Sequence, residues 1–179
     1  MVRLRSTANC SNTPRVLYAL EELGESYDVE VVPDGVFTAA HGIPGPELVD
    51  GDRSVFEITA QLRHVARRFG AGSLWPTDVY AQAEVDRWID FQAVRVSKAQ
   101  ATRDVAGLLT LLGALDRHVA VRPWVLGDDF TIADIGFVPL LQKRAALAPQ
   151  LDRHAAIGGY LDRLAARPAW ARAQARAPR

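Results

Sequence analysis

The feature that most constrains the fold is the disappearance of strand patterns after residue 70. Before this point, short runs of alternating apolar and polar residues stand between helical patterns, and after it apolar residues recur only at helical spacing. Gly70, Gly72 and Pro76 fall between the two parts, and such residues interrupt regular structure. The sequence therefore predicts a mixed α/β domain over residues 1–70, a linker over 71–78 and an all-helical domain over 79–179.

The first part has a defined order of elements. Alternation predicts a strand at residues 2–5 and another at 27–31, with a helix between them that begins at Thr13-Pro14 and ends at Gly24. We expect Thr13 to cap this helix. Two further strands flank the turn at residues 50–52, and a helix covers 57–69. Strand–helix–strand followed by strand–strand–helix is the thioredoxin-like arrangement.

Charge and composition exclude several classes of function. The 21 basic and 21 acidic side chains cancel, so no net field attracts nucleic acid. No apolar run approaches the roughly 20 residues of a membrane span. The single cysteine, Cys10, has no internal disulfide partner, and no N-terminal segment has the pattern of a signal peptide. We therefore expect a cytoplasmic protein that binds neither nucleic acid nor membrane.

A capping box is predicted at Thr131, where Asp134 returns a hydrogen bond to the cap. The segment 126–135 resembles the turn and the start of the sixth helix of glutathione transferases. Further segments resemble that family in the same order along the chain, at residues 18–24, 46–52, 73–76, 88–92 and 160–168. The chain is thus similar to the glutathione S-transferase superfamily, as a short bacterial-type member of theta-like or beta-like character. The resemblance implies an α/β thioredoxin-like N-terminal domain followed by an all-α C-terminal domain.

The resemblance implies attack by the glutathione thiolate on a small electrophile. A free thiol with a pKa of about 8.5 is mostly protonated at neutral pH, so the site must favour the anion. Cys10 and Ser11 lie just before the first helix and match the family's catalytic segment. Cys10 resembles the cysteine of the beta class, and Ser11 the serine of theta-like and zeta-like classes. We favour Ser11 as the thiolate stabiliser, with Cys10 as a mixed-disulfide alternative; outside the family frame they would be a buried small residue and a turn residue.

The resemblance also assigns glutathione-binding residues. Gly45 and Pro46 occupy the place of the family's cis-proline, whose preceding backbone pairs with the cysteinyl part of glutathione, and we expect a cis bond. Glu57 matches the acidic residue at the start of the third helix, although the same residue could simply oppose the helix dipole. Ile58 replaces the serine that normally follows, and Thr59 offers the nearest hydroxyl.

Two stretches depart from the family pattern by being short. Few residues separate Val32 from Gly45, where the family places a helix with basic side chains, and His41 is the only candidate replacement. The pocket helices between Gln92 and Asp116 are also trimmed. A non-catalytic interaction module, or a glutathione-dependent isomerase or lyase of the same fold, therefore remains an alternative. The other histidines are too scattered to bind a metal, and we expect none; a homodimer is implied by the family.

Overall fold

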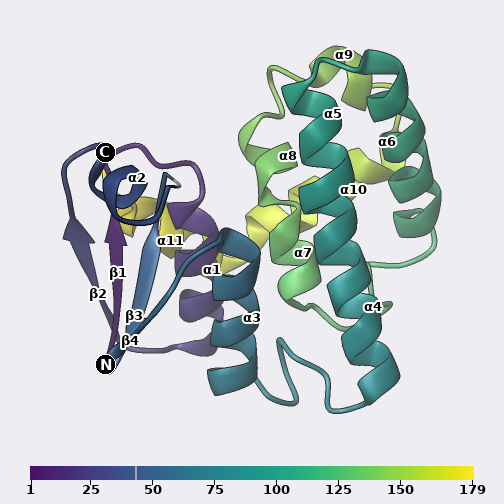
Figure 1. Ribbon diagram of the computed structural model, residues 1–179. Coiled ribbons are helices and arrows are strands. Elements are labelled where there is room, and N and C mark those ends of the chain that lie inside the picture. The colour runs from purple at the N-terminus through teal and green to yellow at the C-terminus, as the bar shows by residue number, and fades with distance from the viewer. Residues whose placement is uncertain (43) are drawn as a thin grey trace. The chain divides into compact units, whose positions relative to one another are not determined.

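The computed structural model describes residues 1–42 and 44–179 (Figure 1). It divides into two units. The thioredoxin-like unit consists of Met1–Ala71 together with Pro168–Arg179, and the helical unit consists of Gly72–Arg167. The domain limits predicted from the sequence differ from these units at the last helix, which clusters with the thioredoxin-like unit.

The thioredoxin-like unit is built on a four-stranded sheet with the order β2-β1-β3-β4. Strand β1 (Val2–Ser6) pairs in parallel with β2 (Tyr27–Val31) and antiparallel with β3 (Glu47–Asp50). The hairpin closes as β3 pairs antiparallel with β4 (Arg53–Val55). The predicted strands and their thioredoxin-like order are confirmed.

Helices lie on both faces of this sheet. On one face are α1 (Thr13–Leu23), α3 (Ile58–Phe69) and α11 (Pro168–Arg176), which pack together (Figure 1). Alternate residues of β1 are buried toward them, and each fully buried aliphatic side chain such as Leu4 contributes about 1.5–3 kcal/mol. The short helix α2 (Val36–His41) lies on the other face, where its Phe37 ring is 6.0 Å from the guanidinium of Arg5.

Two local expectations for this unit are corrected. A helix does stand between Val32 and Gly45, namely the six-residue α2. Thr13 is not a cap but the first residue of α1, and the N-cap is Asn12, which makes no side-chain capping bond. The reason is tertiary: the Thr13 hydroxyl is buried and hydrogen-bonded to the hydroxyl of Ser6, at 2.5 Å.

The C-terminal helix α11 is attached to α1 and β2 by side chains. Trp170 packs on Tyr18 with ring centroids 5.5 Å apart. The Arg172 Nε donates to Glu21 Oε2 at 2.7 Å, and the Tyr27 hydroxyl donates to Glu21 Oε1 at 2.5 Å. These contacts lower the pKa of Glu21 against the opposing effect of burial. The last helix is therefore part of the thioredoxin-like core.

The helical unit is formed by consecutive helices around an apolar core. They are α4 (Val79–Asp90), the π-helix η1 (Phe91–Val96), α5 (Ser97–Ala101), α6 (Val105–Val119), α7 (Ile132–Gly136), α8 (Val138–Gln142), α9 (Ala148–Leu151) and α10 (Ala155–Ala166). Helices α7 and α8 are separate, because Pro139 has no N–H to continue the hydrogen-bond ladder of α7. In the described part of the chain, no helix is long and apolar enough to cross a membrane.

The predicted capping box is confirmed at the start of α7. The carboxylate of Asp134 accepts the backbone N–H of Thr131 at 3.0 Å, while the Thr131 hydroxyl accepts that of Ala133 at 3.2 Å. Asp134 also accepts the N–H of Val125 and the hydroxyl of Tyr160, each at 3.0 Å. The side chain is fully buried, and burial raises its pKa to about 6 although these hydrogen bonds act in the opposite direction. One carboxylate thus joins three segments of the helical unit.

Candidate functional site

The loop between β1 and α1 carries the predicted catalytic residues. It is closed by the N–H of Thr13, which donates to the carbonyl of Cys10 at 3.2 Å, and by the hydroxyl contact between Ser6 and Thr13. Before Cys10, Asn9 takes a left-handed backbone conformation with φ 57°, and its N–H donates to the carbonyl of Pro178 at 3.1 Å. Cys10 and Ser11 are therefore held just ahead of the positive end of α1.

Cys10 faces the second predicted segment. Its Sγ is 3.7 Å from the carbonyl oxygen of Gly45, to which the thiol donates. Cys10 is half-buried, whereas the neighbouring Ser11 is exposed on the loop. The fold thus brings together Cys10 and the Gly45-Pro46 segment, which are 35 residues apart in the sequence.

The expected cis bond before Pro46 is wrong. No peptide bond in the described part of the chain is cis, so Gly45–Pro46 is trans. Trans is the favoured form of such bonds by about 0.5–1 kcal/mol, and here the Phe37 ring packs directly against Gly45. A β-carbon on Gly45 would lie 2.0 Å from Phe37 Cδ2. Glycine is therefore required at this position by the aromatic ring of α2.

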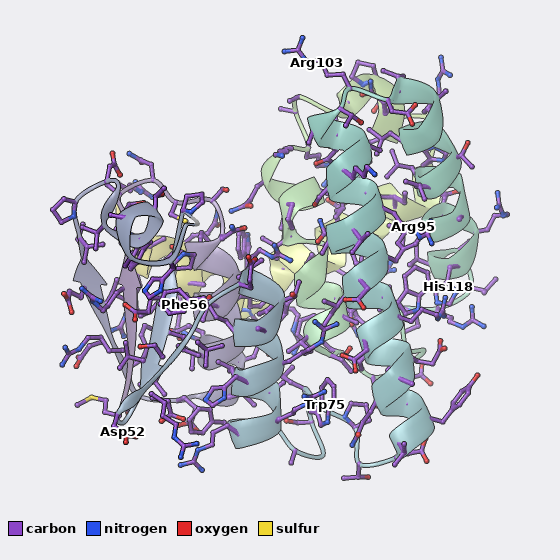
Figure 2. All side chains as sticks on the ribbon, viewed as in Figure 1. Asp52, Phe56, Trp75, Arg95, Arg103 and His118 are labelled. Atoms are coloured by element: carbon purple, nitrogen blue, oxygen red, sulfur yellow. The ribbon has the colours of Figure 1, made fainter. Side chains whose placement is uncertain are left out.

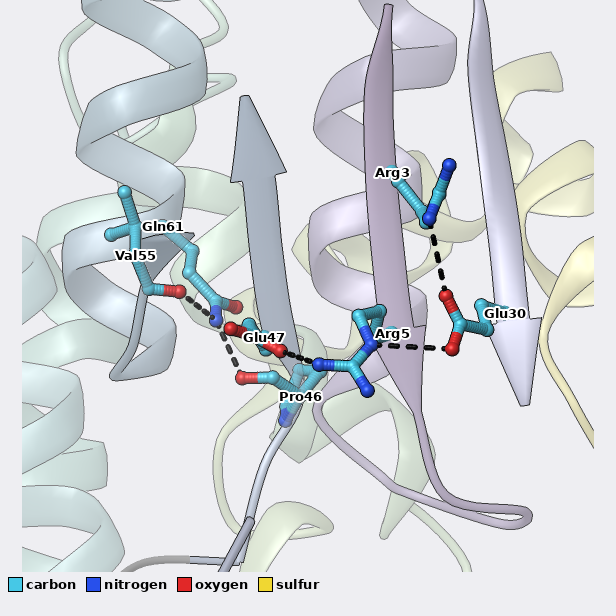
Figure 3. Close-up of polar contacts among 7 residues, drawn as sticks. All are labelled: Arg3, Arg5, Glu30, Pro46, Glu47, Val55 and Gln61. Carbon is cyan, nitrogen blue, oxygen red and sulfur yellow. Dashed lines mark hydrogen bonds and ion pairs between the residues drawn. The ribbon is translucent and has the colours of Figure 1, made fainter. Parts of the chain in front are cut away.

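Gln61 connects Pro46 to α3 (Figure 3). Its fully buried carboxamide Nε2 donates to the carbonyl of Pro46 at 2.6 Å and to that of Val55 at 2.9 Å. One side chain thereby fixes the entry to β3, the end of β4 and the first turn of α3. The sequence analysis missed Gln61. Its position next to Leu62, on the apolar face of α3, could have indicated a structural role in the sequence. A glutamine at a buried position needs hydrogen-bond partners.

A charged row across the sheet supports the same segment (Figure 3). Arg5, at the centre, contacts Glu30 of β2 at 3.3 Å and makes a short ion pair with Glu47 of β3. Glu47 is nearly buried and directly follows Pro46. The hydrogen bond to Glu47 raises the pKa of Arg5 further above its usual range. Pro46 is therefore held from both sides, by Gln61 and by the strand that this ion pair anchors.

The start of α3 presents the residues predicted to meet a carboxylate. Glu57 is the N-cap, is exposed, and has φ 64° and ψ 122°, a conformation that side-chain-bearing residues rarely adopt. Ile58 and Thr59 follow in the first turn and are half-buried. Backbone N–H groups in a first helical turn have no partner within the helix, which makes them suitable for binding an anion.

His41, the last residue of α2, lies against Phe56, a residue labelled in Figure 2. The two ring centroids are 3.6 Å apart. Because Phe56 immediately precedes Glu57, this stacking holds the imidazole close to the start of α3. His41, the candidate replacement named from the sequence, is thus anchored by a ring contact at the end of α2.

Arg15 is a second residue that the sequence analysis missed. It lies in the first turn of α1 and is only 3% exposed, and its guanidinium donates to Asn12 Oδ1 at 3.4 Å. Burial lowers the pKa of Arg15 to about 10, so the group remains charged at neutral pH. A positive charge at the start of α1 adds to the helix dipole in favouring an anion there. The sequence already showed a basic residue four positions after Ser11, which could have indicated a positive charge near the proposed site.

Over residues 1–42 and 44–179, no group of three or more histidine, cysteine or acidic side chains is placed to hold an ion. The site instead offers a thiol, a hydroxyl, backbone polar groups and a positive helix end.

The protein therefore has a thioredoxin-like unit, in which a thiol faces a Gly-Pro segment, and a separate helical unit. Comparisons with known proteins indicate the family in which this combination occurs. Residues 87–168 match the family model of the glutathione S-transferase C-terminal domain. Glutathione S-transferase GstB of Escherichia coli K12 is 26% identical over 171 residues, covering 79% of this chain and 82% of that protein. These comparisons support membership of the chain in the glutathione S-transferase superfamily.

Solved structures show the same fold. A glutathione transferase family member from Pseudomonas fluorescens, with two glutathione bound, superposes with a TM-score of 0.82 at 24% identity and covers 96% of this chain and 91% of that one. The nitrogen regulation fragment of the yeast prion protein Ure2p gives a TM-score of 0.83 at 22% identity, covering 96% and 95%. Both proteins share the two-part architecture with this chain.

Proposed function

We propose that this protein binds glutathione in the thioredoxin-like unit and that the glutathione thiolate attacks a small electrophile. The observation that carries the proposal is the contact between Cys10 Sγ and the carbonyl of Gly45, directly ahead of α1. Family membership supports it, as does the similar Pseudomonas structure that contains glutathione. The site residues are those named from the sequence: Ser11, Cys10, Gly45, Pro46, Glu57, Ile58 and Thr59.

Each group has a separate role in this proposal. The Gly45 backbone pairs with the cysteinyl part of glutathione, and the Ser11 hydroxyl donates to its sulfur. The positive end of α1 and the charge of Arg15 lower the pKa of that thiol by favouring the thiolate. The first turn of α3 binds the γ-glutamyl carboxylate through backbone N–H groups, and Glu57 attracts the adjacent ammonium group. His41 takes the place of the family's basic side chains of the second helix, which this chain lacks.

Calorimetric titration with glutathione and a conjugation assay with dinitrochlorobenzene test the proposal. Ser11→Ala is expected to lower kcat/KM about ten- to a hundredfold, which is the effect of removing one hydrogen bond to a charged group. The matched control is Ser54→Ala, which removes an exposed serine of β4 and should leave the rate unchanged. If the wild type binds no glutathione, the proposed function is wrong.

Cys10 provides a second candidate chemistry at the same site. In this alternative the Cys10 thiolate attacks glutathione disulfide, forms a mixed disulfide and releases one glutathione as the leaving thiolate. The contact between Cys10 and Gly45 favours it, because glutathione bound to that backbone would bring its sulfur near Cys10. Mass spectrometry after incubation with glutathione disulfide would detect the added mass in the wild type and none in Cys10→Ser.

A non-catalytic role is favoured by Ile58 alone, since the family's serine is absent there. In that case glutathione or a protein partner would bind without turnover. A glutathione-dependent isomerase or lyase of the same fold is a separate alternative, which would turn over only its dedicated substrate. We further propose, from family membership, that the protein is a cytoplasmic homodimer. Binding without conjugation of any electrophile would favour the interaction module.

Introducing the missing hydroxyl should strengthen glutathione binding. Ile58→Ser places a donor in the first turn of α3, where a carboxylate is proposed to lie, and the Kd is expected to fall about tenfold. The same calorimetric titration measures it. Thr59→Ser keeps a hydroxyl on the adjacent residue and serves as the control, with little change expected. An unchanged Kd for Ile58→Ser would show that the carboxylate binds elsewhere.

A further inference from the structure

A cavity of about 380 Å³ lies in the helical unit, where α5, the start of α6 and the segment before α9 meet. These elements gather at the upper end of the unit in Figure 1. The cavity is distinct from the proposed glutathione site, none of whose residues line it. Its volume falls in the range of natural small-molecule sites, about 300–1,000 Å³.

Part of the cavity lining is apolar. Leu108 of α6 and Ala99 of α5 are nearly fully buried and contribute to it, and Leu147 from the opposite segment is half-buried. Such a surface favours an apolar ligand body, because covering it removes hydrocarbon from water. This part of the cavity therefore suits the apolar part of a small molecule.

Two polar atoms in the cavity lining are buried without hydrogen-bond partners among the described residues. They are Nε2 of Gln100, a donor, and Oε1 of Gln150, an acceptor. The orientation of the Gln100 carboxamide follows from its neighbour: Lys143 Nζ, which can only donate, lies 3.4 Å from Gln100 Oε1. Buried polar groups in folded proteins almost always have partners. Both atoms have almost no accessible surface, so each carboxamide must turn toward the cavity for a ligand with one acceptor and one donor to satisfy them.

The charges around the cavity favour an anion. Lys143 is held beside Gln100, and Arg103 stands at the rim with its side chain extending outward (Figure 2). The one acidic lining residue, Asp104, caps α6 by accepting the N–H of Gly107 at 2.8 Å. Arg103 has φ 57°, the left-handed conformation that ends α5, where the N–H of Asp104 donates to the carbonyl of Ala99 at 2.9 Å. Among the described lining residues, two cations stand against one carboxylate, so the net charge of the lining is positive.

We propose that this cavity binds a small organic carboxylate that also carries a hydroxyl or N–H group. Its carboxylate accepts from Lys143 Nζ and Gln100 Nε2, its apolar body lies on Leu108 and Leu147, and its second polar group donates to Gln150 Oε1. The proposal concerns the helical unit alone and does not depend on glutathione binding.

Calorimetric titration with para-hydroxyphenylpropanoate tests the proposal. Wild type is expected to bind it saturably with a Kd near or below about 1 mM, and Lys143→Gln to weaken binding about tenfold or more. Lys98→Gln is the matched control, because Lys98 is the only other lysine of the chain and lines a different cavity. Equal effects of the two substitutions, or no saturable binding by wild type, would overturn the proposal.

Two ligand analogues and one further variant test the polar contacts separately. Phenylpropanamide, which lacks the negative charge, should bind more weakly than phenylpropanoate in wild type, and this difference should be smaller in Lys143→Gln. The para-hydroxyl group should strengthen binding to wild type but not to Gln150→Leu. Circular dichroism would verify that this variant is folded. A hydroxyl advantage that survives in Gln150→Leu would refute the assigned acceptor. Ser11→Ala should bind the probe as wild type does, so this site and the glutathione site can fail independently.

Discussion

Replacing Asp134 by alanine is expected to lower the free energy of unfolding of the helical unit by about 3–5 kcal/mol. The substitution leaves the N–H groups of Val125 and Thr131 and the hydroxyl of Tyr160 buried without their acceptor. Each such group costs about 1–3 kcal/mol. Amide hydrogen exchange in α7 and α10 measures the loss within the unit. Asp128→Ala, an exposed acid of the preceding turn, is the control and should change stability by less than about 0.5 kcal/mol.

The same carboxylate predicts a pH dependence. Burial holds the pKa of Asp134 at about 6, above the value of about 3.9 in an unfolded chain. The folded unit therefore binds this proton more tightly than the unfolded chain does. The resulting stabilisation is full below pH about 4 and is lost as the pH rises to about 6. Asp134→Asn, whatever its absolute stability, should show a smaller decline over this interval; an identical decline would assign it to other groups.

Gly45→Val is expected to destabilise the thioredoxin-like unit by more than about 3 kcal/mol, because its side chain would overlap the Phe37 ring. The φ of Gly45 is not positive, so the effect is steric and not conformational. Urea denaturation followed by amide exchange in β1 and β3 measures it.

A double mutant separates this contact from other causes of the loss. Phe37→Ala removes the obstructing ring and alone costs about 3–5 kcal/mol through the cavity it leaves. The pair Phe37→Ala and Gly45→Val should be less destabilised than the sum of the two single variants. Strict additivity would mean that the two residues do not interact in the way that the structure indicates.

Elements determined by short-range signals could be predicted from the sequence. Gly24 ends α1 in a left-handed conformation, and the Thr131-Asp134 pair forms the expected cap, because both depend on residues within one turn. The position of Cys10 before α1 follows for the same reason. The resemblance to glutathione transferases predicted that a thioredoxin-like domain is followed by a helical domain.

Features that depend on tertiary contacts could not be predicted. Gln61 acts on carbonyls of Pro46 and Val55 that only the folded sheet brings close. Arg15 would be assigned to the surface by composition, yet it is buried in the first turn of α1. The cis bond expected before Pro46 came from position in the family, and the bond is trans. The contact of the Phe37 ring with Gly45 likewise joins residues of separate elements. A pattern read along the chain carries no information on such neighbours.

Residues Pro168–Arg179 follow the helical unit in the sequence but belong to the thioredoxin-like unit, and this affects folding during synthesis on the ribosome. The sheet and α1 are translated first, but the surface of α1 that receives Trp170 stays uncovered until the last helix has emerged. The helical unit, by contrast, is one uninterrupted stretch and can complete its core beforehand. We expect stalled chains that end at residue 167, and that carry a linker long enough to clear the ribosome, to resist proteolysis in their second half and not in their first. This would reverse the usual N-to-C order of domain folding.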